Sequence, residues 1–297
     1  MEKMQNFYIT AVEKISLNDL LLEHLPVPHQ AETVITAGGV WYGRRMRITN
    51  PGHILKKGDT VRVYTSPDQG LYYAIDENRV VFEDEDLLVL YKPCNLNVHA
   101  VPASLYYNLS YGVSRYLKKR GIHMEATPPN RLDRPVEGLV AFAKNKNSER
   151  ELFKLVRKGR ISKWYMAALE KGKGIHRLKI CDRISSQRST TKLDPAGKNA
   201  VSCFVRAESL ENADIYSVFP LTGRRHQIRF HASHYLTPII GDTRYGSRFF
   251  LKPDEIALMC RGFNFPMKGK NLRIRVNPAH IEAFYKKIQQ AQPVSSK

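Results

Sequence analysis

An aspartate set between two arginines is the residue of this sequence best suited to chemistry. Asp133 lies in the run of residues 130–135, with Arg131 and Arg134 on its two sides. A carboxylate beside guanidinium groups is either the acidic partner of a structural ion pair or an ionised nucleophile held next to an anionic substrate. The neighbouring residues allow both interpretations, and the choice between them decides the function.

The charge balance indicates the class of substrate. The 297 residues include 47 Lys and Arg against 28 Asp and Glu, which gives a formal net charge of +19. A cationic surface binds polyanions because neutralising phosphates releases condensed counterions. Nucleic acid is therefore the expected partner, and the alternative is a cationic surface that serves only solubility.

Composition also limits the class of protein. Hydrophobic residues make up 42% of the chain, which is enough for one large core and a small additional domain. No run approaches the roughly 20 apolar residues that cross a membrane, and the N-terminus lacks the apolar core of a secretion signal, so we expect a cytoplasmic protein. The cysteines at 94, 181, 203 and 260 lack the spacing of a zinc site or of a disulfide framework.

Charge divides the chain into two parts. Residues 1–75 carry 8 Lys and Arg and 7 Asp and Glu, so the rest of the chain holds nearly all of the excess charge. We predict a small N-terminal domain over residues 1–66, a linker over 67–75 and a second domain over 76–297.

The N-terminal domain is predicted to hold two short helices, over residues 20–25 and 31–36, and a small sheet. Gly38 and Gly39 lead into a hairpin over 40–47, and residues 57–63 form a later strand. This order resembles the small RNA-binding module of a small-subunit ribosomal protein and of many RNA-modifying enzymes. The first helix lacks basic residues, so RNA contact falls to the hairpin arginines; the alternative is a small adaptor domain with a basic edge. These arginines are Arg44, Arg45 and Arg47.

The second domain is predicted to alternate strands with three helices. One helix follows the spacing of Leu105, Leu109, Val113, Tyr116 and Leu117. Another begins at a capping box of Ser148 and Glu151, and the last runs from Asn277 and Pro278 towards Ile288. The strands are predicted within residues 80–93, and at 164–169, 200–207, 215–220, 226–230 and 272–276.

Three segments of the second domain resemble the RluA-type pseudouridine synthase family. Residues 130–139 are similar to its His-Arg-Leu-Asp signature, residues 163–169 to its Lys-x-Tyr-x-Ala strand, and residues 221–231 to its Thr-Gly-Arg-x-His-Gln-Ile-Arg-x-His strand. Residues 83–93 and 238–246 support the likeness, which runs from about residue 80 to 285. The resemblance implies an α+β fold with a mixed, largely antiparallel sheet, flanking helices and a basic cleft across its middle.

The resemblance also implies an activity, the isomerisation of uridine to pseudouridine in RNA without a cofactor. Asp133 would be the nucleophile, and the sequence leaves open whether it attacks the base, attacks the sugar or deprotonates the sugar. Arg229 suits it as an ion-pair partner, expected to be bidentate, because an ionised aspartate in a dry pocket needs one. Tyr165 would lie against the uracil ring and take the proton from the ring carbon.

Further basic residues are expected to contact the RNA. A paired or stacked uridine reaches such a pocket only when it is flipped out, and Arg131 is the candidate to fill the gap that it leaves. The alternative for Arg131 is phosphate binding or an ion pair within the domain. Arg224 and Lys92 complete the expected RNA-binding set, with Lys92 in a supportive or structural role.

Three histidines within nine residues, His226, His231 and His234, raise the question of a metal site. On a regular strand His226 and His231 face opposite sides, so we expect no metal there. Asp242 stands in a turn-like run over residues 241–246, where we expect it to hold backbone groups.

The sequence departs from the family pattern at four places, one of which is Val136-Glu137, where Thr-Ser is usual. Asn130 stands where histidine is usual, Asn95 replaces a glycine, and Met259 lies where histidine is common. Glu137 matters most, because a carboxylate near Asp133 would repel phosphate if it faced the RNA, although Arg134 could neutralise it.

Activity is expected because Asp133, Tyr165 and Arg229 are intact, and nothing demands more than a monomer. The target remains open between ribosomal, transfer and other RNA. One alternative is a catalytically inactive RNA-binding protein of the same fold that acts in ribosome assembly. A DNA-acting protein that flips bases is a further alternative, disfavoured because the N-terminal module resembles RNA binders.

Overall fold

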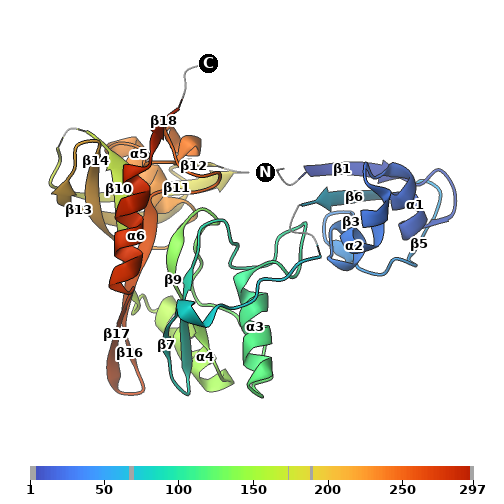
Figure 1. Ribbon diagram of the computed structural model, residues 1–297, viewed down its shortest axis with the longest axis horizontal. Helices are drawn as coiled ribbons and strands as arrows, with labels where there is room; N and C mark the ends of the chain where they lie inside the picture. The colour runs from blue at the N-terminus through green and yellow to red at the C-terminus, as the bar shows by residue number, and fades with distance from the viewer. Residues whose placement is uncertain (1–4, 67–69, 173, 188–189, 295–297) are drawn as a thin grey trace. The chain divides into compact units, whose positions relative to one another are not determined.

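The chain folds into two compact units in the computed structural model, which describes residues 5–66, 70–172, 174–187 and 190–294 (Figure 1). The first unit contains the chain up to Ile75 together with the segment Asn97–Ala126. The second contains Asp76–Leu96 and the chain from Thr127 onward. The segment Asn97–Ala126 therefore groups with the N-terminal residues, although the sequence placed it in the second domain. The functional division at residues 66 and 75 stays a prediction, and residues 67–69 of the linker lie outside the described residues.

The first unit places two helices beside a four-stranded sheet, which confirms the predicted helices and hairpin. Ser16 caps the first helix by accepting a hydrogen bond from the backbone N–H of Asp19, and Leu17, Leu20 and Leu21 are buried in the core. The sheet has the order β1-β6-β3-β4, and a further two-stranded sheet joins β2 and β5. The elements are β1 (Gln5–Thr10), β2 (Ile15–Ser16), α1 (Leu17–His24), α2 (Ala31–Thr36), β3 (Val40–Tyr42), β4 (Met46–Ile48), β5 (Ile54–Leu55) and β6 (Thr60–Thr65).

The segment Asn97–Ala126 completes the first unit with helix α3 (Leu109–Lys119). The predicted helix is confirmed from Leu109 onward, and Leu105 lies before it. Hydrogen bonds tie the segment to the N-terminal residues, among them Leu105 N–H to the Ala37 carbonyl at 2.9 Å, Trp41 Nε1 to the Pro102 carbonyl at 3.0 Å, and Arg47 Nη2 to the Val101 carbonyl at 3.1 Å.

A ten-stranded sheet forms the frame of the second unit, in the order β12-β11-β13-β14-β10-β16-β9-β8-β7, with β17 also paired to β16. Its described strand pairs are antiparallel except β16 with β9, where Cys260 opposes Gly138 in parallel register. The predicted mixed, largely antiparallel sheet is confirmed. The strands are β7 (Val80–Glu83), β8 (Leu87–Lys92), β9 (Glu137–Ala143), β10 (Ser162–Glu170), β11 (Arg177–Gln187), β12 (Thr190–Leu193), β13 (Lys198–Ser209), β14 (Ala213–Pro220), β16 (Leu258–Met267) and β17 (Lys270–Arg275), and a separate small sheet pairs β15 (Phe249–Phe250) with β18 (Gln292–Pro293).

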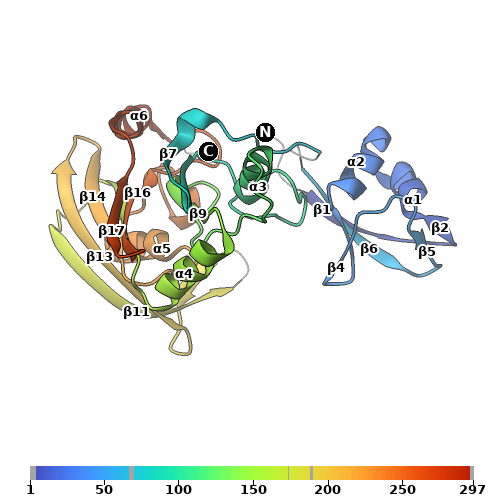
Figure 2. The same ribbon diagram turned by 90° about the horizontal axis from the view of Figure 1, so that it is seen from below.

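Helices cover both faces of this sheet. Figures 1 and 2 show α6 (Pro278–Gln289) on one face, and α4 (Lys146–Arg157) and α5 (Gln227–Tyr235) on the other. The predicted start of α6 is confirmed, with Asn277 as its cap. The predicted capping box of α4 is wrong, because Asn145 is the cap: its side chain accepts a hydrogen bond at 2.9 Å from the N–H of Ser148, which is itself buried. None of the helices in the described part of the chain has the length and apolar character needed to cross a bilayer.

One predicted strand is wrong. Residues 226–230 alternate polar and apolar side chains, which is typical of a strand, yet they form the beginning of α5. His226 precedes the helix in the left-handed region, with a φ of 52°. The alternation led to a wrong prediction because successive residues of α5 are buried whether they are polar or apolar. The sequence of α5 therefore lacks the amphipathic period that is typical of a helix.

Candidate active site

Asp133 lies in a fixed loop that leads into β9. Leu132 and Val136 are buried on either side of it, and the Val136 N–H closes a turn on the Asp133 carbonyl at 3.0 Å. Lys92 Nζ donates to the Arg134 carbonyl at 3.2 Å. These contacts hold the backbone, while the Asp133 side chain retains 22% exposure and lines a cavity.

Lys92 is a support for this loop and cannot contact RNA, which corrects its place among the RNA-binding residues. Its side chain is fully buried at the end of β8. Besides Arg134, its ammonium donates at 2.8 Å to the carbonyls of Pro93 and Leu96. Burial lowers the pKa of Lys92 to about 7, against the opposing effect of nearby acidic groups.

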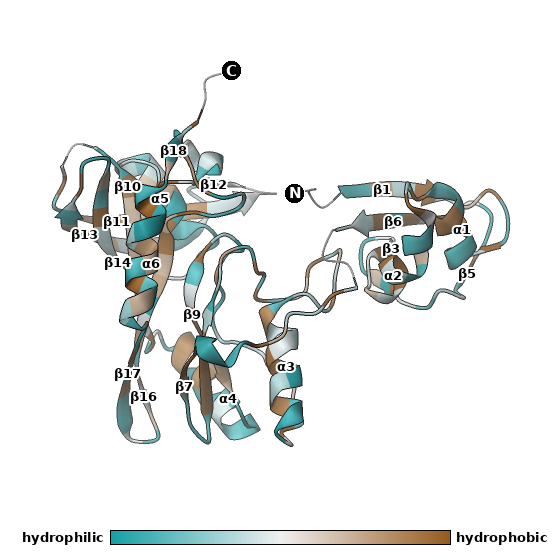
Figure 3. Cartoon of the chain, viewed as in Figure 1, coloured by the Kyte–Doolittle hydropathy of each residue, from teal (hydrophilic) through white to brown (hydrophobic). Residues whose placement is uncertain are grey.

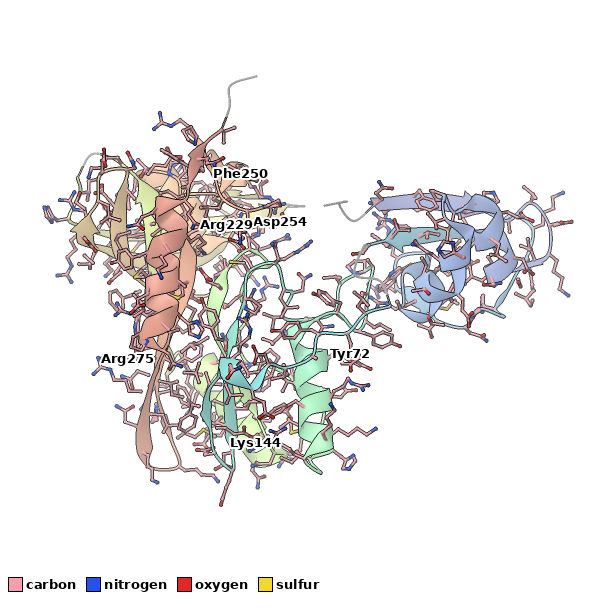
Figure 4. The ribbon with its side chains drawn as sticks, in the orientation of Figure 1. Tyr72, Lys144, Arg229, Phe250, Asp254 and Arg275 are labelled. Atoms are coloured by element: carbon pink, nitrogen blue, oxygen red, sulfur yellow. The ribbon has the colours of Figure 1, made fainter. Side chains whose placement is uncertain are left out.

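Arg229 joins two carboxylates in the second unit (labelled in Figure 4). Its Nη1 donates to Asp133 Oδ2 at 3.2 Å, and its Nε and Nη2 donate to the two oxygens of Asp242 at 2.7 Å each. The bidentate partner of Arg229 is therefore Asp242, whereas the sequence predicted it to be Asp133. Asp242 was expected to hold backbone groups, and it holds a guanidinium instead.

The two carboxylates differ in exposure. The side chain of Asp242 is 1% exposed and that of Arg229 is 5% exposed. Burial alone would lower the pKa of Arg229, but Asp242 and then Asp133 outweigh it and raise the pKa above its ordinary value. The arginine thus stays cationic, and Asp242 fixes its orientation. Asp133 Oδ1 accepts no hydrogen bond from the described residues, which leaves that oxygen available for chemistry.

Asp133, Tyr165 and Arg229 line one cavity of about 800 Å³. This volume is in the range of roughly 300–1,000 Å³ that is usual for small-molecule sites. The cavity is walled by the loop of Asp133, by the beginning of β10 and by the residues before and within α5. The structure thus brings together the three residues that the sequence placed in one cleft.

Tyr165 forms part of this wall from β10. It stands opposite Cys260 of β16, beside an irregularity in the strand pairing, and its side chain is buried. Burial raises the pKa of Tyr165 well above its ordinary value, and Cys260 and Asp133 add to the effect. Tyr165 is therefore a neutral phenol at physiological pH.

The strand geometry used to argue against a metal site was wrong, because the histidines of this region lie at the start of and within helix α5. His226 and His231 have separate partners. His226 shares a hydrogen bond of 3.0 Å with the Tyr245 hydroxyl, and its Nε2 lies 3.7 Å from Asp133 Oδ2. His231 shares one of 3.0 Å with Ser202 Oγ. Burial lowers the pKa of each imidazole to about 4, so both are neutral. The described residues contain no group of three metal-ligating side chains.

Two of the expected RNA-binding arginines, Arg131 and Arg224, are exposed and line the cavity. Arg224 is oriented by its Nε, which donates to the Asn199 carbonyl at 2.8 Å. Arg131 forms no ion pair within the described part of the chain, which agrees with a side chain available to RNA.

The hairpin arginines of the first unit divide into two kinds. Arg44 and Arg45 are exposed in the turn between β3 and β4. Arg47 is half-buried, with its guanidinium 4.4 Å from the centre of the Trp41 ring and one N–H on the Val101 carbonyl. Its role in holding the first unit together leaves Arg44 and Arg45 as the accessible pair.

Glu137 faces away from the cavity, so it does not repel a bound phosphate. It accepts a hydrogen bond of 2.8 Å from the Tyr91 hydroxyl and forms an ion pair with Lys287 of α6. Arg134, expected as its neutralising partner, instead lies 3.6 Å from Asp254 (labelled in Figure 4).

The other three departures occupy distinct environments. Asn95 has a φ of 63°, a conformation that explains why glycine is usual there, and its Nδ2 donates to the Pro253 carbonyl at 2.7 Å. Met259 is fully buried in β16. Asn130 lines the cavity, and its Nδ2 is buried without a hydrogen-bond partner in the described structure.

Sequence reasoning missed the residues that hold Arg229 and His226. Asp242 binds Arg229, and the Tyr245 hydroxyl contacts His226 while its ring centre lies 5.2 Å from the Arg229 guanidinium. Both belong to residues 241–246, whose resemblance to the family was visible. The sequence held no signal for the contact of Asp242, because an acid in a turn-like run is usually bonded to its own backbone.

Comparison with known proteins agrees with this geometry. The model of the RNA pseudouridylate synthase family matches residues 86–234, which is half of the chain. The chain belongs to the RNA pseudouridylate synthase family. It is an enzyme, an RNA pseudouridine synthase of the intramolecular isomerase class, and the resemblance found in its sequence is confirmed.

Individual relatives agree with this assignment. The chain is 28% identical over 250 residues to a protein named ribosomal large subunit pseudouridine synthase C of Buchnera aphidicola subsp. Baizongia pistaciae, covering 76% of this chain and 78% of the relative. It is 30% identical over 207 residues to the tRNA pseudouridine(31) synthase of Saccharomyces cerevisiae, covering 61% and 50%. The solved structure of human RNA pseudouridylate synthase domain containing 4 shares the fold, with a TM-score of 0.59 at 18% identity and coverage of 73% and 94%.

Proposed function

We propose that Asp133 is the nucleophile with which this pseudouridine synthase isomerises a flipped-out uridine in ribosomal or transfer RNA. The observation that carries the proposal is the position of its carboxylate. One oxygen is held by Arg229 at 3.2 Å, while the side chain remains partly exposed in a cavity of about 800 Å³.

The chemistry needs a charge kept in place. Asp133 forms a bond to the substrate that breaks again and returns the free carboxylate. Over the whole reaction the bond from ribose C1′ to ring N1 breaks, a bond from C1′ to ring C5 forms, C5 loses a proton and N1 gains one, so the atoms balance without a cofactor. Arg229 donates one hydrogen bond to the Asp133 carboxylate and so holds it in a fixed orientation. Asp242 positions Arg229, so the guanidinium needs no reorganisation during the reaction.

Tyr165 is proposed as the aromatic wall against the uracil ring, which its burial and position in the cavity support. Acceptance of the C5 proton by its hydroxyl stays a prediction, since the raised pKa of Tyr165 disfavours the phenolate. Arg131 at the cavity is proposed to fill the gap that the flipped base leaves, and Arg224 to bind phosphate. The cytoplasmic location and the monomeric state also stay predictions.

Release of tritium from RNA labelled at C5 of uracil tests the activity and the substrate class together. Ribosomal and transfer RNA are labelled in cells that lack the gene, purified separately and incubated with the protein. We expect release from one fraction and none with Asp133→Ala. Equal release by Asp133→Ala would remove the aspartate from the mechanism, and release from neither fraction would contradict the proposed substrates.

A further inference from the structure

The segment Asn97–Ala126 supplies most of the net positive charge of the first unit. It carries four Lys and Arg against one Asp or Glu, whereas residues 1–75 carry eight against seven. Its basic residues lie in a short run at and beyond the middle of α3, and the acid, Glu125, follows the helix. The first unit therefore has a further local concentration of cations besides the hairpin arginines, on an element that the sequence assigned to the other domain.

Helix α3 presents these cations on one side. Val113, Tyr116 and Leu117 are buried, whereas Arg115, Lys118, Lys119 and Arg120 are exposed. Figure 3 shows polar and apolar residues on different sides of the helix. Lys118 and Lys119 form no ion pair within the described residues, so no carboxylate of the described chain neutralises them. Adjacent unpaired cations repel one another, and an external anion relieves that repulsion.

An exposed aromatic ring adjoins the same side. Tyr72 retains 47% exposure, and the Arg115 guanidinium lies 4.4 Å from the centre of its ring (Tyr72 is labelled beside α3 in Figure 4). Tyr111 and then Tyr72 raise the pKa of Arg115 above its ordinary value, so the side chain stays cationic. Arginine stacked on an exposed tyrosine, next to further cations, is the arrangement by which proteins hold the backbone and an unpaired base of single-stranded nucleic acid.

Helix α1 and the hairpin of the first unit offer few exposed cations for binding RNA. Helix α1 holds no Lys or Arg, and Arg47 is turned towards Trp41 and Val101. Arg44 and Arg45 remain as the exposed hairpin pair, at a site distinct from α3 in sequence. Because Asn97–Ala126 groups with the N-terminal residues, α3 adds Lys and Arg to a unit whose first helix holds none.

We propose that the exposed side of α3 together with Tyr72, called here the α3 surface, binds single-stranded RNA. Lys118 and Lys119 contact phosphates, and one unpaired base stacks on Tyr72 on the ring face opposite Arg115. The inference deepens the proposed function by naming where the first unit holds the strand outside the catalytic cavity. It rests on the proposed function only for RNA as the substrate. The α3 surface is Tyr72, Arg115, Lys118, Lys119 and Arg120.

Salt-dependent binding of labelled poly(U) to the full chain tests the phosphate contacts. The test variant Lys118→Ala/Lys119→Ala removes two charges from the α3 surface. The control Lys56→Ala/Lys57→Ala removes two exposed adjacent lysines from elsewhere in the same unit. We expect the test variant to lower the magnitude of the slope of log affinity against log salt by about 1.4, roughly 0.7 for each lost phosphate contact, and the control to leave it unchanged. Equal slopes for both double variants would overturn the proposal, since only net charge would then matter.

Tyr72 tests the stacked base. We expect Tyr72→Ala to weaken poly(U) binding by roughly fivefold to a hundredfold, and Tyr72→Phe, which keeps the ring, to leave it unchanged. Equal affinity of Tyr72→Ala and wild type would overturn the stacking contact. So would a preference of the wild type for duplex RNA with no dependence on Tyr72, because a paired base is not available to stack.

Turnover separates this inference from the proposed function. At saturating labelled RNA we expect the Lys118→Ala/Lys119→Ala protein to release tritium at the wild-type rate, with a raised RNA concentration at half-maximal rate. An absence of tritium release by the wild type would contradict the proposed function while the poly(U) measurements still decide the inference. A lower maximal rate with unchanged binding would place α3 in catalysis and contradict it.

Discussion

Replacing Asp242 with asparagine separates the positioning of Arg229 from its contact with Asp133. The Asp242 carboxylate accepts two hydrogen bonds of 2.7 Å from Arg229, whereas the bond from Arg229 to Asp133 is a single one of 3.2 Å. An asparagine of the same shape has one acceptor oxygen, and its NH₂ group faces a donor. The substitution therefore breaks one of the two bonds and removes a buried charge partner.

The expected loss follows from the burial of the pair. Breaking a buried ion pair by removing one partner costs about 3–5 kcal/mol, and because Asp133 still faces Arg229 we expect Asp242→Asn to lie near about 3 kcal/mol. Freed from Asp242, the guanidinium can turn towards Asp133 and pair with it more fully, which makes the carboxylate a weaker nucleophile. We expect both a lower free energy of unfolding and a slower single turnover.

Urea unfolding and single-turnover tritium release measure the two effects. Asp254→Asn is the matched control, because Asp254 and Arg134 form an exposed ion pair at 3.6 Å, for which we expect a change below about 1 kcal/mol. Equal stability and equal turnover of Asp242→Asn and wild type would refute the assignment of Asp242 as the anchor of Arg229. A stability loss with unchanged turnover would show that the anchor is structural alone.

Three further outcomes are expected. Tyr165→Phe should keep the affinity for RNA because the ring remains. Slower tritium release in a single-turnover assay would assign a catalytic role to the hydroxyl, and an unchanged rate would exclude that role. Folding lowers the pKa of His226 and His231 from 6.5 to about 4, so the unfolded chain binds more protons between these pH values and the free energy of unfolding falls as the pH drops from 6.5 to 4. The fall, up to about 3 kcal/mol per histidine, should be smaller in His231→Gln when measured by urea unfolding across this range; an equal fall would contradict the burial of a neutral His231. Lys92→Met should destabilise the protein by roughly 1–3 kcal/mol, because three carbonyls lose their donor, and an unchanged urea midpoint would contradict the supporting role of Lys92.

The sequence predicted elements whose signals are local. The proline after Asn277 starts α6, and the spacing of Leu109, Val113 and Leu117 marks α3. The sequence also predicted that Asp133, Tyr165 and Arg229 share one cleft, because each lies in a motif that resembles the family. The structure places all three in the wall of one cavity.

What the sequence could not supply depends on long-range packing. The strand predicted at residues 226–230 is a helix because neighbouring strands bury its polar residues, as Gln227 shows by bonding Val201 and Ser202. Gly138 is needed because a Cβ there would lie 2.3 Å from the Cys260 carbonyl, where β9 and β16 run in parallel. Neither strand reveals that contact by itself.

The grouping of Asn97–Ala126 with the first unit has the same origin. The segment lies in sequence between two strands of the main sheet, and its hydrogen bonds go to Ala37, Trp41 and Arg47. The identity of Asp242 as the partner of Arg229 likewise needed coordinates, because an acid within a turn-like run is usually bonded to its own backbone.

The central claim, that Asp133 acts chemically and is not merely an ion-pair partner, is tested most directly by Asp133→Asn. Asparagine keeps the shape of the side chain and one acceptor for Arg229, and Asp242 continues to hold that arginine. Tritium release and RNA affinity are measured on the same preparation of C5-labelled RNA. We predict that the variant binds the RNA as wild type does and releases no tritium, whereas release at the wild-type rate would contradict the claim.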